Sequence, residues 1–369
     1  MKKLLFFLCF CTLLSCKKEY KTERSFCYWK TTFQSYNFNQ QLADSLGVGH
    51  MYMRLFDVGW NPFEKKPAPM ATLWDFSDEH NKMHITPSIY INNDAIVNSS
   101  REQLRELAAN INKRTIAILS KTEEKTVLWS AAAKRRDSTY TGNKDSLKIK
   151  ETANFKSRIK EILIDCDWTQ KSRDNYFFLL SEIKRQFPNY KIAATIRLWQ
   201  YRDFKKAGVP PVDNGLLMCY NMDSPTNHKT GNSIGSSKTL KQYITHNDYP
   251  LKLNVALPIF NWQLVFRGGE FKGILTDDLL SLRGTDYKKL AENRYMLTND
   301  ITIGQTYFRN GDEVRVEKVS DAELRQMIDI IKDNIDLENS RVTFFSWDEN
   351  FINDYGTKNI EAYYRLFSN

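Results

Sequence analysis

Cysteine and histidine are scarce in this sequence, which has six cysteines and five histidines among 369 residues. The histidines are scattered, and no Cys/His cluster has the spacing of zinc ligands, so we expect no dedicated transition-metal site. Proteins that rely on disulfides normally carry more cysteines, at loop positions. Cys27, Cys166 and Cys219 fall in predicted strands, and we expect them to be small buried hydrophobic residues.

Two further patterns are missing: a glycine-rich phosphate motif and an internal repeat. Gly231–Gly235 lies in a serine-rich stretch, without the strand–turn–helix context of a phosphate loop. The sequence gives no reason to expect a cofactor. The apolar run Leu4–Leu14 is too short for a transmembrane helix, which needs about 20 apolar residues.

The N-terminal segment instead has the pattern of an export signal. Lys2 and Lys3 precede the apolar run, which ends in Leu13-Leu14-Ser15-Cys16. The segment resembles a bacterial lipoprotein signal, in which the cysteine receives lipid such as palmitate and becomes the mature N-terminus. We predict a signal peptide at residues 1–15, lipidation of Cys16 and a charged tether at 16–24. The alternative is an ordinary cleaved signal peptide.

This signal predicts a protein anchored by lipid to a bacterial membrane and facing the periplasm or the cell exterior. The formal charge of +9 falls to +7 when residues 1–15, with two lysines and no acids, are removed. A basic protein could bind an anionic partner, but export argues against nucleic acid. The contents of 41% hydrophobic and 13% aromatic residues indicate a folded chain.

Strand-like and helix-like segments alternate along the chain, which is long enough for one large barrel. Helical spacing is seen at Asn39–Leu46, Arg101–Ile118 and Asn175–Arg185. Eight segments have strand character: Ser25–Phe33, His50–Trp60, Lys82–Ile91, Glu161–Thr169, Lys191–Trp199, Gly215–Met222, Leu251–Phe260 and Arg341–Asp348. The alternation predicts an α/β fold, a closed (β/α)8 TIM barrel in a single domain at 25–369.

Two segments interrupt this alternation. Residues 120–150 are polar and basic, and we expect an exposed excursion. Its basic residues could touch an anionic surface, but a solvated loop is the simpler expectation. Residues 265–320 form an insertion between the seventh and eighth strands, longer than usual connections. In Tyr307–Val316, Asn-Gly between β-forming runs predicts a hairpin. The helix Ala322–Asn334 should follow.

Polar and aromatic residues follow nearly every predicted strand, which favours a barrel over an open doubly wound sheet, because the carboxyl ends of barrel strands converge on one mouth. These residues are Tyr28, Trp29, Asp57, Trp60, Tyr90, Asn92, Asp165, Asp167, Arg197, Trp199, Tyr220, Asn221, Asn261, Trp262, Trp347, Asp348 and Glu349.

The stretch Glu161–Thr169 is the centre of this pattern. A strand's period of two places Asp165 and Asp167 on one face, and Cys166 and Trp168 on the other. Two carboxylates facing the same way need hydrogen bonds, a cation, a metal or a proton to compensate their charge. Alternatively, the aspartates cap a loop just past the strand and are purely structural.

Three motifs resemble the chitinase-type, family-eighteen glycoside hydrolases. Asp165-Cys166-Asp167-Trp168 matches the middle of that family's Asp-x-x-Asp-x-Asp-x-Glu signature. Met218-Cys219-Tyr220-Asn221 is similar to its sixth-strand motif, and Ala256–Trp262 to its proline-containing seventh strand end. The resemblance implies a TIM barrel that acts on a carbohydrate, with Trp347 as the tryptophan beneath the sugar.

The sequence departs from this family at two signature positions. Thr169 stands where the family has the glutamate that protonates the leaving oxygen, and a threonine hydroxyl cannot serve as that acid. Ile162 stands at the first aspartate. A shift by one strand period would place Asp167 at the acid position, but it would lose the match at Trp168, and we prefer the match.

Three mechanisms follow for this site. Asp165 and Asp167 can stabilise charge while Glu349 or Asp57, with a raised pKa, donates the proton. The site can instead bind a sugar without cutting it, with Trp199, Trp262 and Trp347 stacking on sugar faces. The weakest alternative is a hard cation such as calcium between the two aspartates.

We therefore predict a diverged glycoside hydrolase-like lipoprotein, with a non-catalytic glycan-binding or scaffold lipoprotein as the alternative. Its partners would be a carbohydrate and, through the lipid, a membrane. Arg197 could also be a structural ion-pair partner of Asp165 or Asp167. The predicted catalytic residues are Asp165, Asp167, Tyr220 and Glu349, and the predicted substrate-binding residues are Asp57, Arg197, Trp199, Asn221, Trp262 and Trp347.

Overall fold

The structure is a computed structural model that describes residues 20–33, 38–73, 83–136, 143–275, 286–303 and 306–368. The predicted signal peptide and Cys16 lie outside these residues. Within them, no helix combines the length and apolar character needed to cross a membrane.

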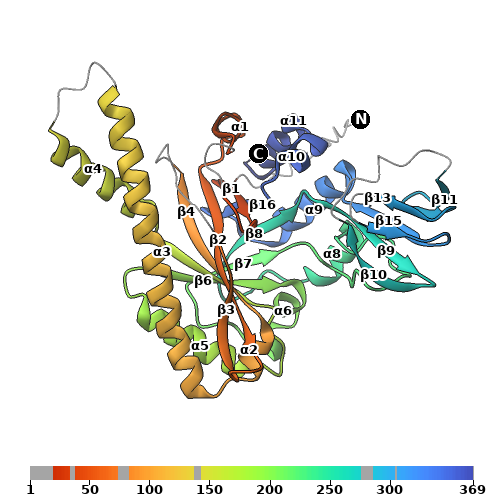
Figure 1. Cartoon of the computed structure of the whole chain (residues 1–369), viewed down its shortest axis with the longest axis horizontal. Coiled ribbons are helices and arrows are strands. Elements are labelled where there is room, and N and C mark those ends of the chain that lie inside the picture. The colour runs from red at the N-terminus through yellow and green to blue at the C-terminus, as the bar shows by residue number, and fades with distance from the viewer. Residues whose placement is uncertain are drawn as a thin grey trace, which may run out of the picture.

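Eight parallel strands form a closed barrel (Figure 1). The barrel closes because β1 pairs with β2 on one side and with β16 on the other. The predicted (β/α)8 TIM barrel is therefore confirmed. Its strands are β1 (Glu23–Tyr28), β2 (His50–Asn61), β4 (His84–Ile91), β5 (Glu161–Asp165), β6 (Lys191–Arg197), β7 (Asn214–Met218), β8 (Lys252–Pro258) and β16 (Arg341–Phe345).

Helices cover the outside of the barrel, so the strands are buried on both faces and are nearly all apolar. In β5, Ile162, Leu163 and Ile164 are fully buried. The helices are α1 (Gln40–Ser45), α2 (Asn93–Val97), α3 (Arg101–Arg136), α4 (Lys144–Ser157), α5 (Arg173–Gln186), α6 (Leu198–Arg202), α7 (Phe204–Ala207), α8 (Ser237–Tyr243), α9 (Asp321–Asn334), α10 (Glu349–Tyr355) and α11 (Thr357–Ser368).

An ion-pair cluster occupies the amino-terminal end of the barrel. Arg341 donates from Nη1 to Glu161 at 2.6 Å and from Nε to Glu23 at 2.9 Å. Asn214 donates to the second oxygen of Glu161 at 2.6 Å. These bonds link strands β1, β5, β7 and β16, so polar groups here stabilise the barrel, as is usual at this end.

The basic segment at 120–150 is helical in its described part, and the expected solvated loop is wrong there. Helix α3 continues to Arg136, and α4 packs against its second half. Buried side chains at helical spacing, including Leu119, Val127, Ala131, Leu147 and Phe155, provide the contact. A helix this polar is stabilised by the partner that covers its apolar side, which a loop interpretation overlooks.

The insertion between the seventh and eighth strands is confirmed, and it forms a separate five-stranded sheet in the order β10-β9-β15-β12-β11. This sheet has a small core of its own, which consists of four buried apolar side chains: Val265, Leu297, Phe308 and Val314. Its strands are β9 (Asn261–Arg267), β10 (Glu270–Leu275), β11 (Tyr287–Ala291), β12 (Arg294–Leu297) and β15 (Glu313–Lys318), with the pair β13 (Ile301–Ile303) and β14 (Thr306–Phe308) beside them.

The predicted hairpin at Tyr307–Val316 is wrong. Strand β14 pairs with β13, whereas β15 pairs with β9 and β12. Gly311 does turn the chain, with a φ of +87°. Its N–H donates to the carbonyl of Leu297, so the turn joins the end of β12 instead of closing a local hairpin. Asn-Gly specifies a turn, but the sheet decides which strands meet.

Strand β3 (Lys66–Thr72) is among the strands that were not predicted. It runs antiparallel to the end of β2 and extends the sheet beyond the barrel. Two prolines lie within it, and prolines are tolerated there because β3 is an edge strand. The β2–β3 hairpin stands at the carboxyl end of the barrel, next to the mouth (Figure 1).

Candidate functional site

Asp165 ends strand β5 inside the barrel mouth and is only 6% exposed. The hydroxyl of Thr195, on the neighbouring strand β6, donates to its Oδ1 at 2.7 Å. Burial raises the pKa of Asp165 to about 6; the Thr195 hydrogen bond opposes this shift, and the nearby charge of Asp167 adds to it. Asp165 is thus a buried acid that titrates close to neutral pH.

Asp167 lies just past the strand and is bound by Arg197 from the end of β6. Nε of Arg197 donates to Oδ1 at 2.5 Å and Nη2 donates to Oδ2 at 2.7 Å, which is a bidentate pair. The side chains are 23% exposed for Arg197 and 45% for Asp167. Burial lowers the pKa of Arg197, but the hydrogen bonds and charge of Asp167 raise it by more.

The residue after Asp167, Trp168, packs toward helix α5. Trp168 is fully buried against α5, with Tyr176 stacked at 6.1 Å and Phe177 edge-on at 5.2 Å. Gln200 joins the two loops that carry the ion pair, because it donates to the Trp168 carbonyl and accepts from the Arg197 N–H. The positions of Asp167 and Arg197 are therefore fixed by buried neighbours.

A cleft of about 230 Å³ opens beside this ion pair. Five of the predicted site residues line it: Asp167, Arg197, Trp199, Tyr220 and Asn221. The other lining residues are Trp168, Thr169, Leu198, Met222 and Tyr243. Asp167 is the only acid among these described residues, and Thr169 stands at the wall where the family resemblance places a glutamate.

The strand-β7 end supplies two cleft residues with different environments. Tyr220 is buried, stacks on Phe345 at 4.9 Å, and has a pKa raised by burial. Asn221 has a left-handed backbone with φ of +51°, which asparagine tolerates better than most residues. Its Oδ1 is buried, and no hydrogen-bond partner for it lies among the described residues.

Trp347 and Glu349 lie in a second hollow of about 330 Å³, away from the acid pair. Trp347 is 4% exposed and packs on Phe26 and Phe38. Glu349, in the first turn of α10, accepts from Asn39 at 3.4 Å. Glu349 lines this hollow, between the ends of β1 and β16, and is not among the residues that line the cleft.

The last two predicted residues also have partners outside the cleft. Asp57 forms a bidentate pair with Arg54 of the same strand, with one bond of 2.6 Å. Trp262 is on β9 of the insertion and donates from Nε1 to Glu317 at 2.6 Å. The structure thus brings five of the ten predicted residues to the cleft, with Asp165 beneath Asp167.

Three residues at or near the site, Arg54, Thr195 and Tyr243, were not among those predicted from the sequence. A charged residue inside the apolar run of β2 was a usable signal for Arg54, because charges are rarely buried without a partner. Thr195 sits one position beyond the β5–β6 partners Ile164 and Ala194, next to Asp165, and only the sheet register reveals it. Tyr243 ends α8 and carries no local signal.

No group of three or more His, Cys, Asp or Glu side chains within the described ranges could hold a metal ion. In the acid pair, both oxygens of Asp167 already bind Arg197. Cys27, Cys166 and Cys219 are buried free thiols, as predicted.

Neither a protein family model nor a curated relative matches this sequence. Solved structures do align with it. The spore cortex-lytic enzyme SleL of Bacillus cereus is 13% identical, with a TM-score of 0.42, over 95% of this chain and 75% of that enzyme. The chitinase ChiW of a Paenibacillus species is 9% identical, with a TM-score of 0.46, over 93% of this chain and 33% of that one.

Domain 2 of a thermostable chitinase from Pyrococcus furiosus, solved with chito-oligosaccharides, also aligns. It is 11% identical, with a TM-score of 0.32, over 89% of this chain and 84% of that one. At these identities the likeness concerns the fold.

Proposed function

We propose that the protein is a lipid-anchored, extracytoplasmic receptor that binds a glycan in the cleft beside Asp167 and Arg197 without cutting it. Between the two functions that the sequence left open, the geometry of the site favours binding over hydrolysis. The fold and the three motifs suggest a carbohydrate ligand. The pairing of Asp167 and Asp57 with arginines argues against hydrolysis.

One observation carries this proposal: Asp167, the accessible acid of the cleft, is already paired with Arg197. General acid catalysis needs a protonated carboxyl group within hydrogen-bond reach of the leaving oxygen. Both oxygens of Asp167 accept hydrogen bonds from Arg197, so neither oxygen is placed to donate a proton to a leaving oxygen. Asp57 is paired with Arg54 in the same way, and Glu349 lines the other hollow.

The cleft nevertheless offers the groups that recognise a sugar. Trp199 and Tyr243 supply aromatic surface on which the apolar face of a sugar ring can stack. The exposed part of Asp167 can accept from a hydroxyl, and Asn221 Oδ1 is a buried acceptor without a partner in the described structure. Ligand pockets generally combine apolar walls with a few fixed polar groups of this kind.

The membrane location is part of the same proposal and rests on the N-terminal sequence. Residues 1–15 would be removed and Cys16 would carry lipid. Mass spectrometry of the protein purified from membranes tests this directly: we expect an acylated N-terminal peptide beginning at Cys16, and a Cys16→Ser variant that is absent from the membrane fraction. An unmodified N-terminus at any other residue would contradict it.

Glycan binding can be tested with the chain at 17–369 on an array of β-linked glucose and N-acetylglucosamine oligosaccharides, followed by calorimetry and a reducing-end assay. We expect binding with no release of reducing ends. Trp199→Ala should weaken binding about tenfold or more through lost aromatic contact. Trp129→Ala, which removes an exposed tryptophan of helix α3, is the matched control and should bind normally. Absence of binding to every oligosaccharide would overturn the proposal.

Hydrolysis is the second candidate, because one observation favours it. The pKa of Asp165 is raised by burial to about 6, which is the range of a general acid that works near neutral pH. In that case reducing ends would appear with a rate that falls as pH rises through about 6, and Asp165→Asn would abolish it while glycan binding remained.

A further inference from the structure

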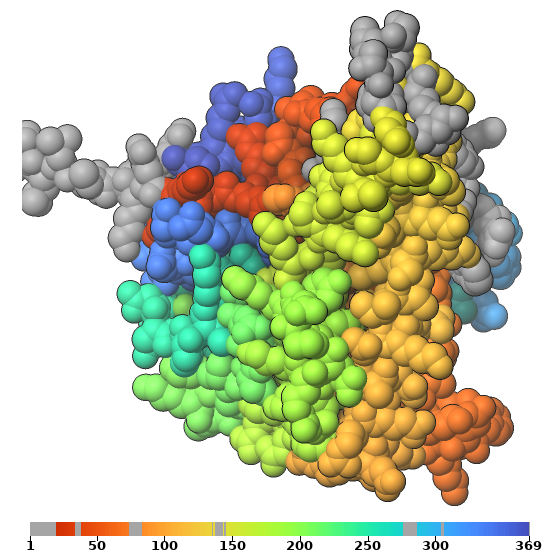
Figure 2. Space-filling model, turned by 90° about the vertical axis from the view of Figure 1, so that its left-hand side faces the viewer, coloured from red at the N-terminus to blue at the C-terminus, as the bar shows by residue number. Residues whose placement is uncertain are grey.

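Helix α3 is much longer than the barrel that it covers. Its 36 residues span about 54 Å, whereas the eight-residue strand β4 beside it spans about 26 Å. Near its start, Gln103 donates to the carbonyl of Lys65 in the β2–β3 hairpin at the mouth end. Figures 1 and 2 show α3 running from there along the side of the molecule and past the opposite end.

The second half of α3 and helix α4 form an arm, defined here as residues 121–136 and 144–157. The arm returns to the barrel at its amino-terminal end, because Ile85 at the start of β4 donates to the carbonyl of Arg158 just after α4. Ser130 donates to Glu151 across the two helices, so α3 and α4 are held together. The arm is a rigid projection on the end of the barrel opposite the mouth.

The described chain also begins at this end. Glu23 opens β1 by donating to Ser340, just before β16, and Tyr20 donates to the carbonyl of Lys332. Cys16 lies four positions before Tyr20 in the chain, which limits their separation to about 14 Å. A lipid on Cys16 would therefore hold this end of the barrel against the membrane.

The surface of the arm is apolar and basic. Leu128 is 50% exposed, Trp129 51% and Ile149 71%. Lys121 and Arg136 are exposed on the same side of α3 as Leu128 and Trp129, at helical spacing, and Lys125 and Ala132 are half-buried on that side. The arm contains nine Lys and Arg residues against four Asp and Glu residues, so it carries more than half of the formal excess charge of the chain.

We propose that this arm is a second membrane contact, which binds the anionic phospholipid surface on which the Cys16 lipid is anchored. Leu128 and Trp129 would enter the headgroup boundary, where tryptophan is favoured, and the basic side chains would lie against lipid phosphates. The arm fixes the barrel with its mouth turned away from the bilayer.

The experiment uses the chain at 17–369, which lacks Cys16 and therefore any lipid. Flotation with vesicles of phosphatidylethanolamine and phosphatidylglycerol should recover the protein, and vesicles of phosphatidylcholine should recover much less. The double variant Leu128→Ser/Trp129→Ser should bind anionic vesicles about tenfold more weakly, because two exposed apolar side chains are lost. Both positions are about half exposed, so circular dichroism should be unchanged.

The matched control is Phe63→Ser/Met70→Ser, which removes two apolar side chains, 95% and 69% exposed, from the β2–β3 region at the mouth end. It should bind vesicles as the parent does. Equal loss in both double variants, or no loss in the arm variant, would overturn the proposal, as would absence of vesicle binding. Self-association that the arm variant abolishes, without vesicle binding, would assign the surface to a second copy instead. Glycan binding in the cleft is measured separately, so failure of one proposal is distinguishable from failure of the other.

Discussion

The barrel mouth and the insertion each contain an arginine that binds a carboxylate, and the two pairs differ in what surrounds them. Arg197 and Asp167 at the mouth remain partly exposed beside a cleft. In the insertion, Arg315 and Glu317 form an ion pair of 2.6 Å with no exposure of either side chain. The same chemical pair is thus open to a ligand in one region and closed in the other.

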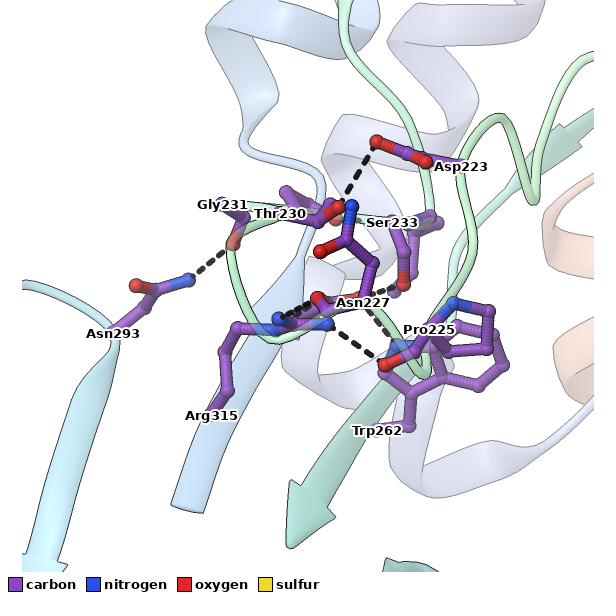
Figure 3. Close-up of polar contacts among 12 residues, drawn as sticks. Asp223, Pro225, Asn227, Thr230, Gly231, Ser233, Trp262, Asn293 and Arg315 are labelled. Carbon is purple, nitrogen blue, oxygen red and sulfur yellow. Dashed lines mark hydrogen bonds and ion pairs between the residues drawn. The ribbon is translucent and has the colours of Figure 1, made fainter. Parts of the chain in front are cut away.

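The buried pair fastens the loop after β7 to the insertion sheet (Figure 3). Arg315 donates to the carbonyls of Pro225 and Asn227 at 3.0 and 2.8 Å. Glu317 accepts from Ser233 at 2.5 Å and from Trp262 at 2.6 Å. This loop begins at the cleft residues Asn221 and Met222, so the insertion supports one wall of the cleft.

A structural pair and a binding pair differ less in residue type than in how much of their hydrogen-bonding capacity is used by other protein groups. Arginine has five N–H donors and a carboxylate about four acceptor sites. In the insertion, protein groups use this capacity to tie a loop in place. At the mouth, part of the Asp167 carboxylate still faces solvent and can exchange water for a ligand.

The largest expected effect is on stability, from breaking the buried pair. Arg315→Met should destabilise the protein by about 3–5 kcal/mol, because Glu317 is left as a buried charge without its partner. Thermal and urea unfolding would measure the change. The matched control Arg325→Met removes an exposed i,i+4 partner of Asp321 and should cost less than about 1 kcal/mol. Similar losses of unfolding free energy in the two variants would contradict the difference between the buried pair and an exposed one.

The next effect is a pH dependence that should have opposite signs in the two regions. Asp165 has a folded pKa of about 6 against an ordinary value of 3.8. Its ionisation therefore destabilises the fold as pH rises from about 4 to 6, by about 3 kcal/mol in all. Asp165→Asn removes this penalty, so the variant should gain stability relative to the parent between pH 4 and pH 7, as measured by urea unfolding.

Asp312 in the insertion is the counterpart. Burial raises its pKa, but the bidentate bond from Arg267 and the Arg309 N–H lower it by more. Its ionised form thus stabilises the fold above its ordinary pKa, and this contribution is lost in acid. Asp312→Asn should therefore be less stable than the parent above about pH 4, and this deficit should shrink as pH falls below the ordinary pKa of 3.8. Parallel trends in the two variants would contradict the assignment.

A smaller effect distinguishes the roles of the two arginines. Arg197→Met leaves Asp167 45% exposed and hydrated, so the cost in stability should be about 1 kcal/mol, well below that of Arg315→Met. Glycan affinity should fall about tenfold, because Asp167 and the loop of Trp168 lose their fixed position. Calorimetry and thermal unfolding on the same two variants separate these effects. Unchanged affinity would place the ligand elsewhere.

The smallest expected effect concerns the second hollow. Lys30 pairs with Asp348 at 2.6 Å, but its side chain is 55% exposed. Lys30→Met should change stability by less than about 1 kcal/mol and should leave glycan affinity unchanged. A loss of affinity comparable to that of Arg197→Met would show that the ligand extends over Trp347 and Glu349.

Much of the barrel was predictable because parallel strands buried on both faces are apolar runs, and helices that cover them have apolar spacing. The strand predicted at His50–Trp60 is β2 to within one residue. The predictions were wrong where contacts with another segment of the chain determine the local structure. The segment at 120–150 is too polar to indicate a buried face, and in its described part α3 and α4 stabilise each other. Phe308 and Val314 flank a correct turn but pair with different strands.

For the candidate site, the sequence located Asp165 and Asp167 at the end of the fourth barrel strand and offered Arg197 as an ion-pair partner of one of them. It could not decide between the two acids, and it could not show that Thr195 binds Asp165 or that Glu349 lies in another hollow. Those contacts depend on the register between neighbouring strands and on the length of each loop, which no local pattern encodes.

The sequence by itself determined the eight-fold alternation, the acids at the end of the fourth barrel strand and the apolar faces that close the ring. These follow from the periods of strands and helices and from the free energy of burying apolar surface. Only the tertiary structure decided which carboxylate is paired, which is buried and which faces a cleft. The charge state and reach of an acid are set by neighbours that arrive from distant parts of the chain.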